Sequence, residues 1–120
     1  MCGIAGIISL DSRLEEKDLV TGRKMTEMLR HRGPDSSGFL HDSRCFLGNT
    51  RLSIIDLSSR ASLPMRSGSD HLWLAYNGEI TNFRELMEEY SLEEKYDFRT
   101  TSDTEVLLHA FAEWGPDFVT

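Results

Sequence analysis

The sequence has no apolar run near the roughly 20 residues that a membrane-spanning helix requires. Its first eight residues, Met-Cys-Gly-Ile-Ala-Gly-Ile-Ile, lack the basic stretch that opens a secretory signal peptide. No low-complexity tract interrupts an otherwise globular composition. We therefore expect a cytoplasmic protein with no membrane partner.

Positive charge, cysteine and metal-ligand patterns are also scarce. Lys and Arg number 13 against 20 Asp and Glu, a net charge of −7 that argues against a nucleic-acid partner. The four histidines are scattered, and the two cysteines form no C-x-x-C pair, so we predict no metal site. Two cysteines favour a reducing compartment, and Cys45, in a short apolar stretch, is predicted to be a small buried hydrophobic residue.

The spacing of apolar residues predicts an α+β fold, without strict β-α-β alternation. Gly33-Pro34-Asp35 predicts a turn, and His109, inside an apolar helical pattern, is predicted to be a satisfied structural histidine. Asn82 and Ser102 each precede a glutamate by three residues, the spacing of a capping box. The expected elements are strands over 3–9, 45–47, 52–55 and 72–76, a loop over 58–70, and helices over about 14–31, from 82 onwards and over about 102–114.

Cys2 is the most informative single residue, because removal of Met1 would give it both a thiol and a free α-amine. An α-amine with a pKa of roughly 7.7–8 is on the order of 10–20% free base at neutral pH, whereas a lysine offers well under about 0.1%. The α-amine is therefore a suitable general base, attached to the nucleophile itself. Any residue can stand at position 2 by chance, so Cys2 alone makes only a weak case.

Three further clusters each allow two interpretations. The segment 30–38, Arg-His-Arg-Gly-Pro-Asp-Ser-Ser-Gly, is either a basic helix end followed by a turn or a loop over an active site. Asn77-Gly78 is either a hairpin turn or a pair of hydrogen-bond donors for an oxyanion. The segment 101–105, Thr-Ser-Asp-Thr-Glu, is explained fully by a capped helix with acidic residues in its first turn.

Taken in this order, the clusters resemble the class II glutamine amidotransferases, which are N-terminal-nucleophile hydrolases. The similarity is greatest to the glutaminase domain of glutamine-hydrolysing asparagine synthetases. It rests on the strings MCGIAGI, RHRGPDSSG, RLSIIDLS, YNGEI and TSDTEVLLHAFAEWG, and it runs from Met1 to about Trp114. The chain departs from the family pattern at Asn49, often His, at Leu63, usually Gln, and at Thr81, usually Tyr.

The resemblance implies a role for particular residues. Cys2, freed of Met1, would attack the side-chain amide of glutamine while its α-amine moves the proton, and Asn77 and Gly78 would form the oxyanion hole. Arg51, assisted by the backbone of Ile54, would hold the substrate α-carboxylate, a task suited to a planar guanidinium.

At the other end of the substrate, Glu79 and Asp103 would face the α-ammonium group. One positively charged side chain is thus expected at the substrate carboxylate and two negatively charged side chains at its ammonium group. This arrangement fits a zwitterionic amino acid.

The resemblance also implies the reaction and its setting. Glutamine would be hydrolysed to glutamate and ammonia through a thioester at Cys2, and ammonia would pass to an ATP-dependent synthetase domain or chain. No cofactor is expected in this domain, and ATP and magnesium are expected only in the synthetase domain. The implied fold is an αββα sandwich, so we expect residues 1–120 to form a partial glutaminase domain, truncated at its C-terminus, without the synthetase domain.

Other possibilities stay open at this point. The chain is alternatively an inactive amidotransferase module that acts in binding or association, or the glutaminase of a different amidotransferase pathway. A homodimer is possible in either case.

Overall fold

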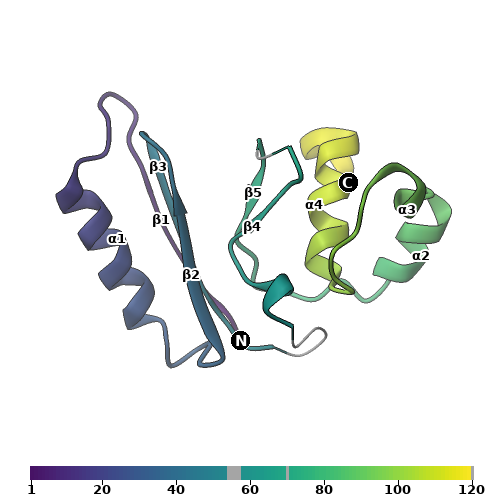
Figure 1. Cartoon of the computed structure of the whole chain (residues 1–120), viewed down its shortest axis with the longest axis horizontal. Coiled ribbons are helices and arrows are strands. Elements are labelled where there is room, and N and C mark those ends of the chain that lie inside the picture. Colours follow the sequence, from purple (N-terminus) through teal and green to yellow (C-terminus); the bar gives the residue numbers. More distant parts are fainter. Residues whose placement is uncertain (54–57, 70, 120) are drawn as a thin grey trace. The chain divides into compact units, whose positions relative to one another are not determined.

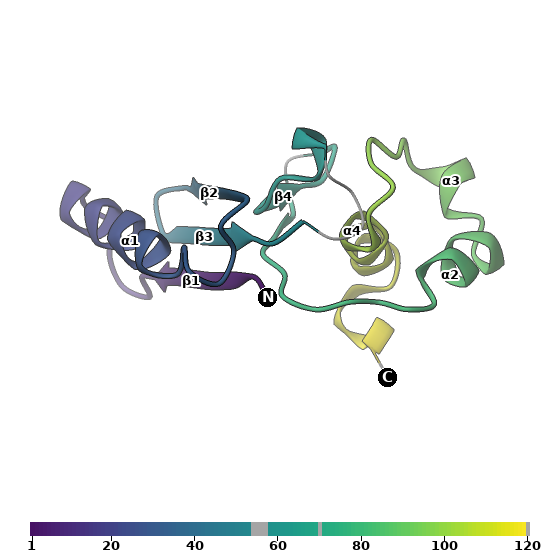
Figure 2. The ribbon, with the colours of Figure 1, turned by 90° about the horizontal axis from the view of Figure 1, so that it is seen from below.

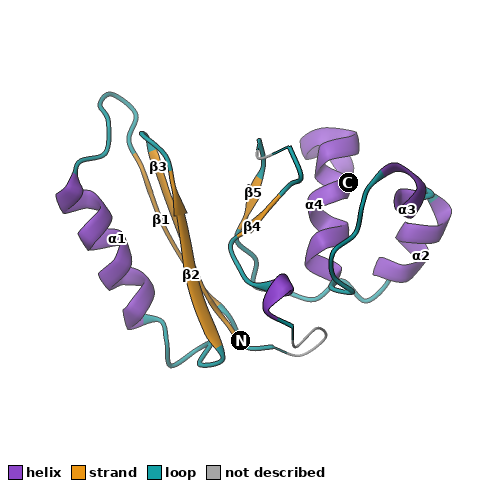
Figure 3. Cartoon of the chain, viewed as in Figure 1, coloured by secondary structure: helices purple, strands orange, loops and turns teal. Residues whose placement is uncertain are grey.

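The structure is a computed structural model that describes residues 1–53, 58–69 and 71–119, coloured along the sequence in Figure 1. The chain divides into two compact units. The first comprises Met1–Ser53, Ser62–Pro64 and Ala75–Gly78, and the second Ile54–Ala61, Met65–Leu74 and Glu79–Thr120. Helices and small antiparallel sheets both occur, which confirms the α+β class (Figure 3). Among the described residues, none of the helices combines the length and apolar character needed to cross a membrane.

The first unit is built on a three-stranded antiparallel sheet of β1 (Gly3–Ile8), β2 (Ser36–His41) and β3 (Cys45–Arg51). β3 runs between the other two strands (Figure 2). β1 confirms the strand expected over 3–9, and β3 extends well beyond the expected 45–47. β2 was not predicted, because Ser36, Ser37 and Gly38 have low β-propensity, and pairing with β3 makes this segment a strand.

Helix α1 (Glu16–Met28) covers one face of this sheet at very short range (Figure 1). A Cβ added at Gly22 would lie 2.6 Å from the ring of Phe46, and one at Gly48 would lie 2.0 Å from Thr26 Oγ1. Phe46 is fully buried in this contact. The two glycines therefore set how closely the helix approaches the sheet.

The helix is shorter than the expected 14–31. Leu29, Arg30 and Arg32 continue it only as three-residue turns, whose amides donate to Thr26, Glu27 and Leu29 carbonyls at 2.9–3.1 Å. The basic residues therefore lie beyond the helix, which rules out the first of the two interpretations of residues 30–38, a basic helix end.

The second unit contains the two-stranded sheet of β4 (Met65–Arg66) and β5 (Trp73–Leu74), and helices α2 (Phe83–Glu89), α3 (Leu92–Lys95) and α4 (Asp103–Trp114). Short 3-10 turns occur at Ser59–Ala61 and Gly115–Val119. The expected loop over 58–70 thus contains a turn and a strand, and the strand expected over 72–76 shrinks to Trp73–Leu74. Leu52 and Ser53 are not in a strand, and residues 54–57 lie outside the described part of the chain.

Helix α4 is the core of the second unit. Ser102 Oγ accepts a hydrogen bond from the Glu105 amide at 3.4 Å, which confirms the predicted cap, whereas Asn82 makes no side-chain cap bond to α2. The buried carboxylate of Glu105 accepts from the Arg99 amide at 3.0 Å and from the Thr100 amide at 2.7 Å. This buried acid therefore ties the preceding loop to the helix. Gly115, with φ 67°, ends α4 as the sequence predicted.

His109 is a further buried ionisable residue of α4. Its ring stacks on Tyr96, with centroids 4.4 Å apart, and meets Phe98 edge-on at 4.7 Å. Within the described residues its buried Nε2 has no hydrogen-bond partner, so the prediction of a satisfied histidine is wrong. Burial lowers the pKa of His109, while Glu105, whose Oε1 lies 3.7 Å from Nε2, opposes that shift.

The glycine contact at α1 predicts a stability loss for Gly22→Ala. Alanine normally improves a helix interior by about 1 kcal/mol over glycine. Here the added methyl would overlap the buried Phe46 ring, so we expect a net loss of about 1–3 kcal/mol in unfolding free energy. Chemical denaturation measures this loss, with exposed Lys24→Ala as a control expected to change stability by less than about 0.5 kcal/mol. A Gly22→Ala protein as stable as wild type would refute the close approach.

The lowered pKa of His109 predicts a pH dependence of stability. Its folded pKa lies below the unfolded value of roughly 6.5, so the unfolded chain binds the proton more readily. The stability that comes from neutral His109 is therefore present above pH ~6.5 and is lost as the pH falls toward its folded pKa. Unfolding temperatures at several pH values should depend less steeply on pH in His109→Gln, whereas the exposed His71→Gln should keep the wild-type slope. An unchanged slope in His109→Gln would contradict the assignment.

Candidate active site

The pairing of β1 with β3 brings Cys2 to Arg51. Gly3 pairs with Thr50 and Ile4 with Asn49, so continuing the register by one residue places Cys2 opposite Arg51. Opposed residues of an antiparallel pair point to the same face, and alternate residues along a strand share a face. Cys2, Asn49 and Arg51 therefore belong to the sheet face opposite α1. Cys2 is half-buried, with Sγ 4.0 Å from the Leu52 carbonyl oxygen, and Arg51 is buried.

Gly3 has a different role from the one that its position beside Cys2 suggests. A glycine beside a nucleophile can let a substrate approach closely. In the structure Gly3 is buried, and an added Cβ would lie 2.8 Å from Leu29 Cβ and 2.8 Å from Thr50 Oγ1. It therefore accommodates the end of α1, on the face opposite the one assigned to Cys2.

The segment after α1 is fastened around Cys2 and the end of β3. Arg32 Nε donates to the Cys2 carbonyl oxygen at 3.3 Å. The Asp35 amide donates to the Arg51 carbonyl at 3.1 Å, and Asp35 Oδ2 accepts from the Ser53 amide at 2.7 Å. Gly33 makes this crossing possible, because a Cβ there would lie 2.5 Å from the Arg51 nitrogen. The turn lies at residues 29–32, just before the predicted Gly33-Pro34-Asp35, and Pro34 forms a β-bridge with Arg51. The segment does lie beside Cys2.

Asn77 and Gly78 belong to the first unit, and Tyr76, the residue before them, is hydrogen-bonded to β3. The Tyr76 amide donates to Asn49 Oδ1 at 3.0 Å, which fixes residues 75–78 to β3. Asn77 and Gly78 themselves are exposed, and neither is part of a hairpin turn. A Cβ at Gly78 would lie 2.6 Å from the Tyr76 hydroxyl, so the Tyr76 side chain folds against this glycine. The hairpin interpretation of Asn77-Gly78 is therefore wrong.

Glu79 and Asp103 both belong to the second unit. Asp103 Oδ2 accepts from the Ile80 amide at 2.9 Å, so the residue next to Glu79 is held at the start of α4. Asp103 is buried, and its Oδ1 has a long contact of 3.5 Å from the Thr104 hydroxyl. Glu79 is exposed. The backbone beside Glu79 is therefore hydrogen-bonded to Asp103, the first residue of α4.

Three further sequence predictions concern Ile54, Cys45 and metal binding. Ile54 lies outside the described residues. Cys45 pairs with Ile8 at the far end of β1 from Cys2, and it is only half-buried, so the prediction of a buried residue is wrong. Burial, followed by the charge of Asp42, raises the pKa of the Cys45 thiol. No group of three His, Cys, Asp or Glu side chains suited to a metal ion occurs within the described ranges.

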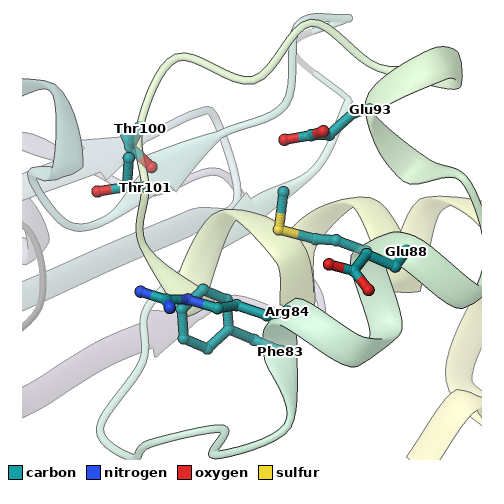
Figure 4. A pocket seen from close by; sticks show the side chains of 7 residues that line it. Phe83, Arg84, Glu88, Glu93, Thr100 and Thr101 are labelled. Carbon is teal, nitrogen blue, oxygen red and sulfur yellow. The ribbon is translucent and has the colours of Figure 1, made fainter.

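The second unit contains a cavity of about 300 Å³. Figure 4 shows it between α2 and the segment at Thr100 and Thr101, with Arg84 and Glu88 on its α2 side. The side chain of Arg84 lies over the ring of Phe83, 5.7 Å from its centroid. None of the predicted site residues contributes to its lining.

Sequence reasoning missed three residues that organise the site: Arg32, Asp35 and Asn49. Arg32 and Asp35 stand inside a recognised cluster, but their partners are 18 to 30 positions away along the chain. Asn49 offers a local signal, since asparagine is disfavoured in strands and, once buried, needs hydrogen-bond partners.

Comparison with known proteins identifies the family of the chain. The profile of the glutamine amidotransferase domain family matches residues 1–120. The chain is 41% identical over 118 residues to asparagine synthetase [glutamine-hydrolyzing] 1 of Bacillus subtilis, covering 95% of this chain and 18% of that protein. It is 37% identical over 122 residues to asparagine synthetase B [glutamine-hydrolyzing] of Escherichia coli, covering 99% and 21%.

A third relative gives the same result. A putative asparagine synthetase [glutamine-hydrolyzing] 2 of Methanocaldococcus jannaschii is 34% identical over 137 residues, covering 99% of this chain and 25% of that protein. The chain thus spans about a fifth of the length of the first two relatives and a quarter of this one. Since the family profile matches the whole chain, the protein belongs to the glutamine amidotransferase domain family.

Proposed function

We propose that this chain is a glutaminase that releases ammonia from glutamine with Cys2 as its nucleophile. The observation that carries the proposal is the strand register, which sets Cys2 opposite Arg51 on the sheet face where Asn49 fastens residues 75–78. A nucleophile, a cation and two exposed donors thus belong to one unit. Arg51 would hold the substrate α-carboxylate, and Asn77 and Gly78 would donate to the oxyanion.

The proposed reaction needs removal of Met1, which is 71% exposed. The free α-amine of Cys2 would take the thiol proton as Sγ attacks the amide carbon of glutamine. The Asn77 side-chain amide and the Gly78 N–H would stabilise the negative oxygen, and the protonated amine would then give its proton to the departing ammonia. Water would hydrolyse the γ-glutamyl thioester to glutamate and restore the thiol.

The α-ammonium group of the substrate would be recognised by negatively charged side chains. The Ile80 amide, next to Glu79 in the chain, donates to Asp103, and both Glu79 and Asp103 would face the α-ammonium group. Burial of Asp103 would strengthen its attraction for a cation, because the local dielectric constant is lower than that of water. The backbone of Ile54 would assist Arg51 at the carboxylate.

The wider assembly is proposed from the relatives. These relatives are named as glutamine-hydrolysing asparagine synthetases, so the ammonia would pass to a synthetase domain or chain. ATP and magnesium would act in that synthetase domain, and the glutaminase step would use no cofactor. The proposed complete fold is an αββα sandwich. Ile4 and Ile8, on the sheet face opposite α1, are 45% and 72% exposed, and a second packed sheet would cover such a face.

Replacement of Cys2 tests the reaction. Cys2→Ala should lower the rate of glutamate release from glutamine by at least about 10³-fold, because no other group would form the thioester. Cys45→Ala is the matched control and should keep wild-type activity, since Cys45 lies at the other end of β1. Intact mass confirms that Met1 is absent from each protein assayed. Equal rates for Cys2→Ala and wild type, with Met1 absent from both, would reject the proposal.

Replacement of Asp103 tests substrate recognition. Asp103→Asn keeps an oxygen for the Ile80 amide but loses the charge, so the unfolding temperature should stay near wild type. The value of kcat/KM for glutamine should fall about 10- to 100-fold, which corresponds to the loss of a charged hydrogen bond. N-acetylglutamine lacks the α-ammonium group, so Asp103→Asn should affect its hydrolysis much less. Exposed Glu88→Gln serves as the control, and equal losses for both substrates would contradict the assignment.

A further inference from the structure

Asn49 is a fully buried polar side chain in the middle strand of the first unit. Its Oδ1 accepts from the Tyr76 amide at 3.0 Å, and its Nδ2 donates to the Thr50 carbonyl oxygen at 2.9 Å. A backbone amide can only donate and a carbonyl can only accept, so the two partners together fix the orientation of the Asn49 amide group. Both the oxygen and the nitrogen of the side-chain amide are therefore hydrogen-bonded.

The partner of Asn49 stands immediately before the two proposed oxyanion donors. Tyr76 is followed by Asn77 and Gly78, and an extended chain advances only about 3.3 Å per residue, so fixing the Tyr76 amide restricts where both donors can lie. The Tyr76 side chain adds to this restriction. A Cβ at Gly78 would lie 2.6 Å from its hydroxyl and 2.8 Å from ring carbon Cζ, so this side chain packs directly on the Gly78 backbone.

Asn49 also shares a strand and a face with the proposed carboxylate-binding residue. It lies two positions before Arg51 and pairs with Ile4, which lies two positions after Cys2. One rigid strand pair therefore carries the nucleophile and, through Asn49, the segment with the donors. Catalysis by electrostatic stabilisation depends on donors that are held in place before the reaction begins.

We propose that Asn49 is a positioning residue that holds the oxyanion donors Asn77 and Gly78 in register with Cys2. The inference rests on the proposed function, since it concerns the same reaction. Asn49 touches neither substrate nor thiol in this role and acts only through the Tyr76 amide. Its removal should therefore raise the barrier of the chemical step and leave glutamine binding nearly unchanged.

The test is steady-state kinetics of glutamine hydrolysis by the protein that carries this chain, with Met1 removed. Asn49→Ala should lower kcat by about 10- to 100-fold, because a small misplacement of oxyanion donors has that effect, while KM changes by less than about threefold. Asn49→Thr also lacks the amide group but suits a strand, so it provides a folded protein if the alanine variant unfolds.

Thr26→Val is the matched control. Thr26 is a buried polar residue of the same unit whose hydroxyl bonds Gly22 at 2.9 Å and has no contact with residues 75–78. Hydrogen exchange supplies a second readout that does not depend on activity. The Tyr76 amide should exchange faster in either Asn49 variant and at the wild-type rate in Thr26→Val, while alkylation of Cys2 by iodoacetamide stays equal in all.

A double-mutant cycle separates positioning from general stability. If Asn49 acts through the donors, Asn49→Ala should lower kcat far less in an Asn77→Ala background than in wild type. Full additivity of the two effects, or an Asn49 variant with wild-type kcat in an active protein, would overturn the inference alone. A wild-type protein with no glutaminase activity would overturn the proposed function and this inference together.

Discussion

The antiparallel pairing of β1 with β3 is the constraint on which the rest of the proposed site depends. Its register joins Gly3 to Thr50, so the N-terminus of the chain is fixed beside the end of β3. An N-terminal nucleophile has no preceding chain to hold it, and a central strand compensates for this by bonding the residues just after it. A shift of one residue would turn the side chains of β1 to the other face and direct Cys2 away from Arg51.

Buried polar side chains then fasten the loops to this framework and to α4. Asn49 holds the Tyr76 amide, Asp103 holds the Ile80 amide, and Glu105 holds the amides of Arg99 and Thr100. Each bond satisfies a backbone donor that the loop would otherwise leave unpaired when buried. Two of the amides held in this way are next to proposed substrate contacts, since Tyr76 precedes Asn77 and Ile80 follows Glu79. The interactions that stabilise the loops would therefore also set the geometry of the site. Stability and function are thus coupled at these positions.

The sequence predicted the elements with strong local signals and missed those made by pairing. β1 and α4 were predicted closely, since an isoleucine-rich run and a Ser102 cap are local features. β2 was missed because its Ser and Gly residues form a strand only by pairing with β3. The strand expected over 72–76 is shorter in the structure, because its partner β4 has only the two residues Met65 and Arg66. Cys2 and Asn77 were recognisable from motifs, but the role of Asn49 depends on Tyr76, 27 positions away, and no spacing rule reveals such a contact.

The account requires that Cys2, and not Cys45, react with a substrate bound at this site. Incubation with a glutamine analogue that carries a chloroketone in place of the side-chain amide, followed by peptide mass mapping, measures this directly, because binding as a substrate makes the reagent alkylate a thiol at the site much faster than one elsewhere. We expect one label, on Cys2, in protein that has lost Met1, with glutamine slowing the reaction, and no label on Cys45, whose thiol pKa is raised by burial. Labelling of Cys45 at a similar rate, or labelling of Cys2 that glutamine does not slow, would contradict the account.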